Sequence, residues 1–470
     1  MQRPRQLAAP PRLAISDSQK LLIGLMVPMA VAVLNWTMFN IAVLDIRDTY
    51  ALSADVTAWL ISAMILAIMI STPVYGSFGD ALGRRNMLLV GMTIFLAGTI
   101  ILFLAPDLRF VLLGRVVQGL GSGALAPLSI AIISARFSAA ERGKALGTWA
   151  MVAPIAGMIG PALGGLVVDN ASWRLIYPPV LVLGAVAWIA LWKLVPATSR
   201  PLERRYLLKF DWLGVVLMGL AVTALVFFVS SRAITGIEGL QDWRLFLAAA
   251  ILLTGFVVWE ERRERPFVKL ALFRLPMFRL ASIGAALWMF AVPGSEFVAA
   301  LYLTDVFALT RSQIGLIAML RSGAFLLTLR LGGQLADRWG SSRGPVMISG
   351  AVQLLFLGLF ATFGTTTPVA LIIVCYAGLG LGAGLSMAAL HRAAMESVME
   401  DQMGMAAGLY STLRFGGSVI GIALLGIVLQ QALERFGVPV QAYQFMFAIV
   451  MIPVALIVLL GWQLRARTPE

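Results

Sequence analysis

The chain of 470 residues has one cysteine, one histidine and few charged residues, which make up 13% of the sequence. A lone cysteine, Cys375, excludes a disulfide within the chain. With His391 as the only histidine, a zinc-type cluster of ligands cannot form. We therefore expect no metal and no cofactor. Since no nucleophile is paired with a base in any recognisable pattern, an enzyme is not expected either.

Apolar residues take the place of the missing charge. They make up 60% of the chain, and the mean hydropathy is +0.90. A soluble chain of this length would need far more polar surface. About 20 apolar residues span a bilayer as a helix, so the sequence predicts an all-α integral membrane protein with fourteen transmembrane helices. The predicted spans are 21–44, 56–78, 87–104, 110–134, 145–168, 175–192, 212–231, 245–259, 280–303, 312–333, 344–362, 369–390, 404–428 and 442–464.

The formal net charge of +13 follows the predicted topology. If the N-terminus is cytoplasmic, most Lys and Arg residues, including all five lysines, lie in cytoplasmic segments, as the positive-inside rule requires. We therefore predict a multi-pass protein of the plasma (cytoplasmic) membrane with both termini in the cytoplasm. The basic residues then face membrane lipids rather than nucleic acid. The first apolar run is too long for a cleavable signal peptide, so it is expected to stay as an anchor.

A short pattern occurs twice, 257 residues apart, as Gly76-Ser-Phe-Gly-Asp80-Ala-Leu-Gly83 and Gly333-Gln-Leu-Ala-Asp337-Arg-Trp-Gly340. Such a repeat suggests a transporter built from two related bundles. Equivalent loops must lie on one side of the membrane, and eight predicted spans separate them. Six belong to the bundles, so two, 212–231 and 245–259, are an inserted pair. The predicted parts are a tail (1–20), a six-helix bundle (21–192), a linker with the inserted pair (193–279), a second six-helix bundle (280–464) and a tail (465–470).

The charged stretch 260–279 is open to two interpretations. It alternates apolar and basic residues, which would suit an amphipathic helix in the headgroup layer. A solvated linker with a basic anchor explains it equally well.

Further motifs accompany the loops, in order and in the expected spans. They are Arg115-Val-Val-Gln118-Gly119, Gly157-Met-Ile-Gly160-Pro161-Ala-Leu-Gly164-Gly165, Phe210-Asp211-Trp212-Leu213-Gly214 and Arg414-Phe415-Gly416-Gly417. With them, the chain resembles the major facilitator superfamily, specifically its fourteen-helix drug:proton antiporter branch, over nearly all residues after 20. The family loop has Leu and Arg where the first copy has Phe78 and Ala81. The resemblance implies transport of a small molecule coupled to protons, and we expect a monomer.

The resemblance also implies that the two loops form a latch that stabilises the outward-facing state. A carboxylate at a helix end can pair with arginine or cap a neighbouring helix, and such contacts can break in another conformation. The alternative is ordinary turn and topology chemistry. The latch residues are Gly76, Asp80, Gly83, Arg84, Gly333, Asp337, Arg338 and Gly340.

Small residues line one face of the predicted span 145–168 at spacings of three and four. They would let another backbone approach closely, and a proline among them removes one helix hydrogen bond. We predict a hinge or a tight seal between the bundles at Gly157, Gly160, Pro161, Gly164 and Gly165. Static packing is the alternative.

Glu296 is the only acidic residue well inside a predicted span. It lies roughly 10 Å from the outer end of its helix, and Arg321 lies roughly 13 Å from the outer end of the next, at 1.5 Å per residue. We therefore predict a Glu296–Arg321 pair. It could carry protons or bind substrate, or it could be structural. Arg115 shares a helix face with Gln118, and the resemblance implies that Arg115 takes part in proton coupling.

The first span departs from the family pattern. It reads Leu34-Asn35-Trp36-Thr37-Met38-Phe39-Asn40, where the branch usually has an aspartate at the position of Asn35. Asparagine cannot exchange protons, so one expected coupling acid is missing. With Arg115, Arg321 and Arg414 inside spans against one acid, the cavity should favour neutral, amphipathic or anionic cargo. The predicted cavity residues are Asn35, Trp36, Phe39, Asn40, Gln118, Trp288 and Arg321.

Three hypotheses remain open at this point. The first is a proton-coupled exporter of hydrophobic or amphipathic compounds that works by alternating access. The second is a transporter of lipids or lipid conjugates with atypical or absent proton coupling. The third is a sensor or scaffold that does not transport, which the intact loop and glycine motifs disfavour.

Overall fold

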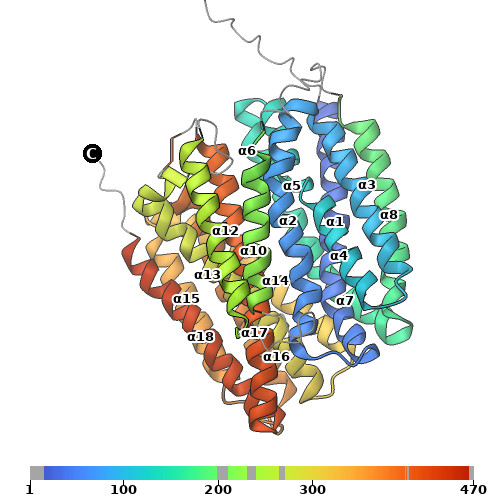
Figure 1. The fold of residues 1–470 in the computed structure, drawn as a ribbon, viewed down its shortest axis with the longest axis vertical. Coiled ribbons are helices and arrows are strands. Elements are labelled where there is room, and N and C mark those ends of the chain that lie inside the picture. Colours follow the sequence, from blue (N-terminus) through green and yellow to red (C-terminus); the bar gives the residue numbers. More distant parts are fainter. Residues whose placement is uncertain are drawn as a thin grey trace, which may run out of the picture.

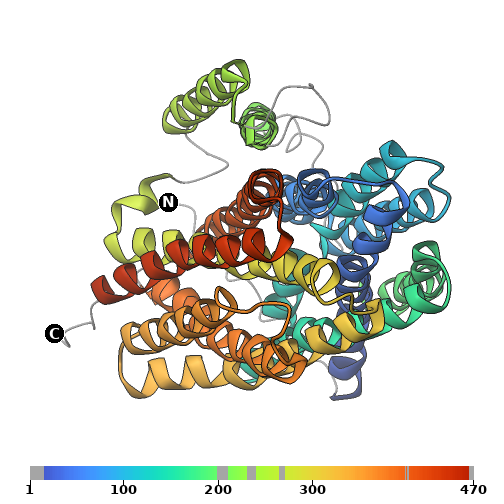
Figure 2. The same ribbon diagram turned by 90° about the horizontal axis from the view of Figure 1, so that it is seen from below.

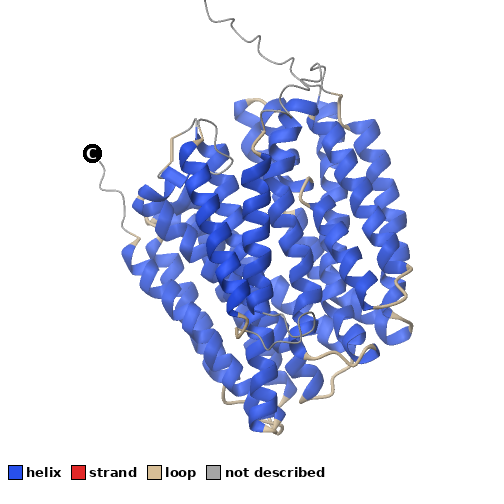
Figure 3. Cartoon of the chain, in the orientation of Figure 1, coloured by secondary structure: helices blue, strands red, loops and turns tan. Residues whose placement is uncertain are grey.

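The structure is a computed structural model that describes residues 15–197, 210–229, 240–263, 270–396, 398–399 and 402–464, and omits the side chains of residues 15, 16, 80, 139, 140, 270, 404 and 405. Over these ranges the chain forms helices joined by turns, without strands (Figure 3). Fourteen helices of the described chain are long and apolar enough to cross a membrane. The predicted all-α membrane fold is confirmed.

The N-terminal helices lie side by side along the long axis of the molecule (Figure 1). Two of the spans are broken by a turn, and one begins with a short 3-10 helix. The bounds are α1 (Ile15–Thr49), α2 (Ala54–Leu82), α3 (Arg84–Phe103), α4 (Leu108–Ser122) continued by α5 (Leu125–Arg136), α6 (Ala139–Ala150) continued by α7 (Val152–Asn170), and η1 (Trp173–Ile176) leading into α8 (Tyr177–Leu194).

The inserted pair and the C-terminal helices follow. The pair consists of α10 (Trp212–Val229) and α12 (Trp243–Arg262). A 3-10 helix, η2 (Leu270–Arg274), precedes the last six helices, which are α13 (Pro276–Asp305), α14 (Arg311–Arg338), α15 (Arg343–Phe360), α16 (Val369–Glu396), α17 (Met403–Phe436) and α18 (Pro439–Gln463). We call α1–α8 the N-terminal half and α13–α18 the C-terminal half.

The second inserted span is longer than its predicted range of 245–259. Asp242 caps α12 by accepting the Arg244 backbone N–H at 3.1 Å, and the helix continues through the charged residues to Arg262. Charged side chains at helix ends can extend towards the headgroups, which is why a count of uncharged residues underestimated this helix. Of the predicted stretch 260–279, residues 264–269 lie outside the described chain, and the remainder is helical at both ends.

Two ends of the molecule are distinguished below. The outer end holds the C-termini of α1, α7 and α13, and the inner end holds the two repeated loops. These names follow the orientation that the basic residues predict, and the orientation itself stays a prediction. So does the division into two six-helix bundles with an inserted pair.

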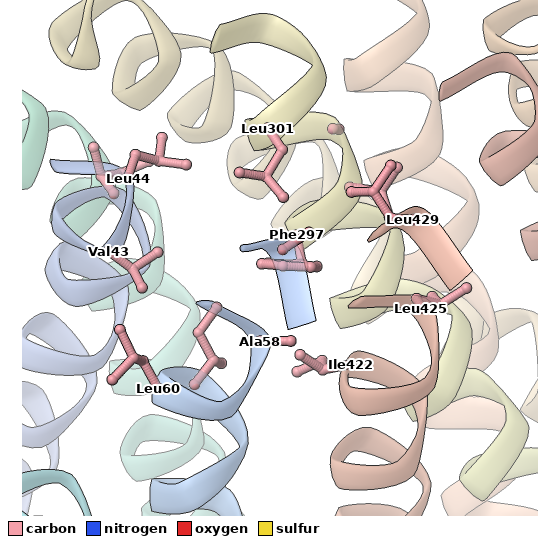
Figure 4. Packing of buried hydrophobic residues seen from close by; sticks show 14 of the residues in the cluster. Val43, Leu44, Ala58, Leu60, Phe297, Leu301, Ile422, Leu425 and Leu429 are labelled. Carbon is pink, nitrogen blue, oxygen red and sulfur yellow. The ribbon is translucent and has the colours of Figure 1, made fainter. Parts of the chain in front are cut away.

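The apolar core differs between the two ends. At the outer end one cluster contains residues from both halves, and Figure 4 shows Val43 and Leu60 of α1 and α2 in the same packed region as Phe297 of α13 and Leu425 of α17. Towards the inner end there are two clusters. One contains only residues of the N-terminal half, and the other contains residues of α10, α12, η2 and the C-terminal half. Among the described residues, the cluster at the outer end is therefore the one that the two halves share.

Candidate functional site

The predicted pair between Glu296 and Arg321 forms. Arg321 Nη1 on α14 contacts Glu296 Oε1 on α13, and the Arg321 guanidinium also lies 5.3 Å from the centre of the Tyr376 ring. The two partners differ in exposure, because the Arg321 side chain is 6% exposed and that of Glu296 is 38% exposed. Since an ionised group is costly in the middle of a membrane, each charge stabilises the other, and the carboxylate is the accessible member.

Arg321 depends on this single acid. Its Nε finds no hydrogen-bond partner within the described chain, and Glu296 is the one acidic group there with which it forms an ion pair. The Tyr376 ring face supplies a weaker interaction with the cation. A proton on Glu296 would remove the carboxylate charge and leave a buried cation beside an aromatic ring. Protonation therefore changes the electrostatics of the interior of the C-terminal half.

A second buried arginine lies in the N-terminal half, in a network of neutral groups. Arg115 donates from Nε to the Leu60 carbonyl at 3.1 Å and from Nη1 to Gln118 Oε1 at 3.2 Å. Asn35 Nδ2 donates to the same Gln118 oxygen at 3.3 Å, and Gln118 Nε2 donates to Thr99 Oγ1 at 2.9 Å. Arg115, Gln118 and Asn35 are fully buried. The described groups that form hydrogen bonds in this network around the Arg115 cation are therefore all neutral.

The departure at Asn35 has a direct structural effect. Asn35 Oδ1 and Arg115 Nη2 are both buried without a hydrogen-bond partner among the described residues. Phe39 covers the guanidinium, with its ring centre 3.8 Å from Arg115 Cζ. An aspartate at position 35 would place a carboxylate beside this cation, where asparagine provides only an amide.

The predicted cavity residues come from both halves of the molecule. Asn35, Phe39 and Gln118 are packed in the network of Arg115. Trp288 is 5% exposed and donates from Nε1 to the Ala383 carbonyl at 3.2 Å within the C-terminal half. Trp36 packs against the outer core, and Asn40 Oδ1 is buried without a partner in the described chain. Their assignment to a substrate cavity remains a prediction.

Most of each repeated loop lies in the last turns of a helix, because α2 continues to Leu82 and α14 to Arg338, beyond the predicted ends at 78 and 333. Each pattern then ends in a glycine with a positive φ. Gly83 has φ of 94° and Gly340 has φ of 58°, a region that residues with a side chain seldom adopt. Gly76 and Gly333, at the starts of the patterns, have room for a Cβ beside them. The backbone conformation of the turns therefore explains why Gly83 and Gly340 are glycines. In this conformation, packing does not require a glycine at Gly76 or Gly333.

The charged residues of the loops contact their own halves. Arg84 Nη1 donates to the Ala131 carbonyl at 2.7 Å, and Asp337 Oδ1 lies 3.3 Å from Arg392 Nη1 on α16. Arg338 is exposed, and the Asp80 side chain lies outside the described chain. None of these described contacts joins the two halves, so the predicted latch for the outward-facing state remains a prediction.

The glycine row of α7 packs against both halves. A Cβ on Gly160 would collide with Thr37 of α1, and one on Gly164 would lie 2.8 Å from Met38 Cα. On the other side, a Cβ on Gly165 would collide with the Arg311 carbonyl, and one on Gly315 of α14 would collide with the Pro161 carbonyl. Helices α7 and α14 therefore cross backbone against backbone, which supports the predicted seal between halves.

Ion pairs at the outer end join the two halves, and the sequence prediction missed them. Arg47 at the end of α1 donates two hydrogen bonds to Asp305 of α13, at 2.9 and 3.1 Å, and Tyr443 of α18 donates to the same carboxylate. Arg311 of α14 pairs with Asp48 of α1. We call these residues the outer lock.

Backbone N–H groups extend the outer lock. The Asp169 carboxylate at the end of α7 accepts the N–H groups of Arg311 at 2.9 Å and Ser312 at 2.7 Å, so it caps α14 of the other half. Gln430 of α17 accepts the Ala54 N–H of α2 at 3.2 Å. An open hollow of about 390 Å³ lies beside the Asp169 cap, lined in part by Asp45, Asp169, Thr304, Thr310 and Arg311.

Comparison with known proteins decides the family. The model of the Major Facilitator Superfamily matches residues 25–422 and again 282–470. The chain belongs to the Major Facilitator Superfamily. Multidrug resistance protein Stp of Mycobacterium tuberculosis (strain CDC 1551 / Oshkosh) is 32% identical over 391 residues, covering 83% of this chain and 72% of Stp. Drug efflux pump JefA of the same strain is 28% identical over 393 residues, covering 83% of this chain and 76% of JefA.

A solved structure supports the same fold. The structure of a POT family transporter in complex with 5-aminolevulinic acid matches with a TM-score of 0.69 and 15% identity, covering 95% of this chain and 96% of that one. At this identity the likeness concerns the fold alone. The chain is thus a multi-pass membrane transporter of the Major Facilitator Superfamily, with fourteen candidate spans and relatives named for drug efflux.

Membership of the Major Facilitator Superfamily gives the outer lock a meaning. Transporters built from two repeats work by rocking one repeat against the other around a central site. Contacts that join the halves at one end therefore close that side. In this structure a shared core, the crossing of α7 and α14, and the outer lock all close the outer end.

Proposed function

We propose that the protein is a proton-coupled exporter of hydrophobic or amphipathic compounds that works by alternating access, with Glu296 as the proton carrier. The observation that carries the proposal is the pair formed by a partly exposed carboxylate and a buried arginine in the middle of the C-terminal half. Relatives named for multidrug resistance and drug efflux support small-molecule export over the lipid alternative.

The pair provides a physical link between a proton and the conformation. A ligand shifts a conformational equilibrium only if it binds the two states differently. A proton on Glu296 abolishes the ion pair with Arg321, so proton affinity depends on whether the conformation keeps these groups together. Arg115 then has a different part, because it keeps its charge and shapes the field of the N-terminal half.

Replacing Glu296 tests the coupling. We expect Glu296→Gln in proteoliposomes to abolish transport driven by a pH gradient, at least tenfold, while exchange of substrate without a gradient persists. Glu396→Gln is a matched control, since Glu396 has a similar exposure of 39% and lies 3.7 Å from Arg392, but at the inner end of α16. Full retention of pH-driven transport by Glu296→Gln would contradict the assignment.

The charge preferred in the substrate can be inferred from Arg115, whose cation has no carboxylate partner among the described residues. We propose neutral or anionic amphipathic substrates, because Asn35 supplies no carboxylate to attract a cationic one. Asn35→Asp should raise transport of cationic dyes several-fold relative to neutral and anionic ones of similar size. Asn86→Asp, at an exposed position of α3, controls for the added charge. A preference for cations in the unmodified protein would contradict the proposal.

The orientation completes the proposal. With both termini in the cytoplasm, the outer lock faces the outside and the repeated loops face the cytoplasm. A reporter that is active only in the cytoplasm, fused after residue 470, should be active. A reporter that is active only outside, placed after Thr365 between α15 and α16, should also be active. The reverse pattern would invert the assignment.

A further inference from the structure

The inserted helices α10 and α12 lie outside the body formed by the other helices, with α10 beside α2 and α17 and α12 packed against α10 (Figure 2). Helix α12 is the least buried of the candidate spans, with 17% of its most apolar window buried. Helix α10 contacts α2 of the N-terminal half and α17 of the C-terminal half. The pair therefore covers the line along which the two halves meet, which raises the question of which half it follows when they move.

Ring contacts attach α10 to α2 near both ends. At the outer end the Phe227 ring lies 5.0 Å from that of Trp59. At the inner end the rings of Phe210 and Trp212 lie 5.1 and 5.3 Å from that of Phe78 and 5.2 Å from each other. We call Phe78, Phe210 and Trp212 the ring cluster. Aromatic pairs in these arrangements contribute more than their buried area alone.

Between these two points α10 keeps close to α2. A Cβ on Gly219 would lie 3.4 Å from Ile70 Cδ1, an ordinary van der Waals contact. Trp59 and Phe78 of α2 thus contact aromatic rings near both ends of α10. On the other side, aliphatic residues of α10 such as Val226 and Met218 share clusters with residues of α17. Aliphatic contacts between α10 and α17 can slide past one another more readily than the interlocked rings between α10 and α2.

The motif at residues 210–214 explains how the pair holds together. Asp211 is buried and accepts the Gly214 N–H at 3.0 Å and the Trp259 indole N–H of α12 at 2.7 Å. A Cβ on Gly214 would lie 2.7 Å from Glu260 Oε1 of α12, so glycine permits the close approach. Asp211 and Gly214 therefore join α10 to α12, while Phe210 and Trp212 face the loop of α2.

The two repeated loops differ at the position that meets the ring cluster. Phe78 is the third residue of the first pattern, and the second pattern has Leu335 there. Only the first loop has the inserted pair as its neighbour in the described chain. The ring of Phe78 is accounted for by its two aromatic partners, Phe210 just before α10 and Trp212 at its start.

We propose that α10 and α12 move with α2 as part of the N-terminal half, and that the ring cluster positions the first repeated loop during the transport cycle. The pair would then slide across α17 when the halves rock. This inference concerns the movement of helices and is independent of the substrate and of Glu296.

Distances between spin labels test the inference directly. In a Cys375→Ala background, cysteines at Val216 of α10, Val90 of α3 and Ile348 of α15 place labels on exposed positions near the inner ends of their helices. Double electron–electron resonance is recorded for the outer-closed protein and for Asp305→Ala, which weakens the outer lock. We expect the Val216–Val90 distance to stay within about 2 Å while the Val216–Ile348 and Val90–Ile348 distances change together, as rigid-body rocking requires. A constant Val216–Ile348 distance with a changing Val216–Val90 distance would overturn the proposal.

A second measurement does not depend on switching the conformation. The double variant Phe210→Ala and Trp212→Ala should broaden the Val216–Val90 distance distribution at least twofold. The conservative variant Trp212→Phe, which keeps a ring at this position, should leave the distribution as narrow as in the unmodified protein. Trp243→Ala removes a tryptophan that is 66% exposed at the start of α12 and should leave the distribution unchanged. If the double variant is too unstable to purify, Phe78→Leu, which copies the second loop, takes its place with the same expected broadening. An unchanged distribution in these ring-cluster variants would also overturn the proposal.

Discussion

The outer and inner ends of this transporter are held together in different ways. At the outer end, ion pairs, helix caps and a common apolar core join the two halves. At the inner end each half contributes to a separate core, and the described contacts of the repeated loops do not join one half to the other. A transporter with equal contacts at both ends could not favour one conformation. The difference shows which end is closed here and which contacts must break for the outer end to open.

Weakening the outer lock should have the largest effect on this comparison. Asp305 accepts hydrogen bonds from Arg47 and Tyr443. Hydrogen bonds to charged groups contribute about 1.5–3 kcal/mol, and partial exposure reduces this value. We expect Asp305→Ala to shift the equilibrium towards the outer-open state by about 2 kcal/mol, roughly 30-fold. Spin labels at the exposed outer positions Leu104 and Leu359 would report the shift.

A carboxylate within one half provides the control for this experiment. Asp107 caps α4 by accepting the N–H groups of Arg109 and Phe110, and neither partner belongs to the other half. Asp107→Ala should leave the distance between the labels unchanged. If Asp305→Ala also left it unchanged, the outer lock would not be what distinguishes the two ends.

Widening the crossing of α7 and α14 should have the next largest effect. Gly315 packs against the Pro161 carbonyl, and a Cβ there has no room. Overpacking of this kind typically costs about 1–3 kcal/mol, so we expect Gly315→Ala to lower the transport rate about tenfold. Gly147→Ala is a matched control, because its Cβ would meet open space. Equal transport rates for Gly315→Ala and Gly147→Ala would show that transport tolerates a wider spacing between α7 and α14.

Changing the second loop should have the smallest effect. The Asp337 side chain is 71% exposed and pairs with Arg392 inside its own half. Exposed pairs contribute about 0–1 kcal/mol, so Asp337→Asn should leave thermal stability unchanged. If Asp337 belongs to a latch for the outward-facing state, the same variant should still slow transport about threefold. If transport were unchanged, Asp337 would serve only to form the turn. Asp80→Asn tests the first loop in the same way.

The sequence allowed contacts in the interior of both halves to be predicted better than the contacts between the halves. The pair of Glu296 and Arg321 followed from depth alone, because both residues lie on adjacent helices at similar distances from the outer end. Arg115 and Gln118 were expected on one helix face, and they are hydrogen-bonded. In both cases helix geometry fixes the relation between residues that are near each other along the chain or on neighbouring spans.

The outer lock could not be predicted in this way. Arg47 and Asp305 are 258 residues apart, and Arg311 and Asp48 are 263 apart. In the sequence these charges looked like ordinary loop residues, and they indicated topology only. Their pairing depends on how the halves meet in one conformation. The orientation of Phe39 over Arg115 likewise depends on side-chain packing that no periodicity describes.

The crossing at Gly315 lies close to one end of a long helix, and it can act as a fulcrum. Helix α14 begins at Arg311 and ends at Arg338, so the fulcrum is roughly 6 Å from the outer lock and roughly 33 Å from Asp337 at 1.5 Å per residue. A tilt of about 10° would displace Arg311 by roughly 1 Å and Asp337 by roughly 6 Å. A displacement of Arg311 by roughly 1 Å is enough to break the hydrogen bonds of the outer lock. The same tilt moves the second repeated loop past the residues that surround it.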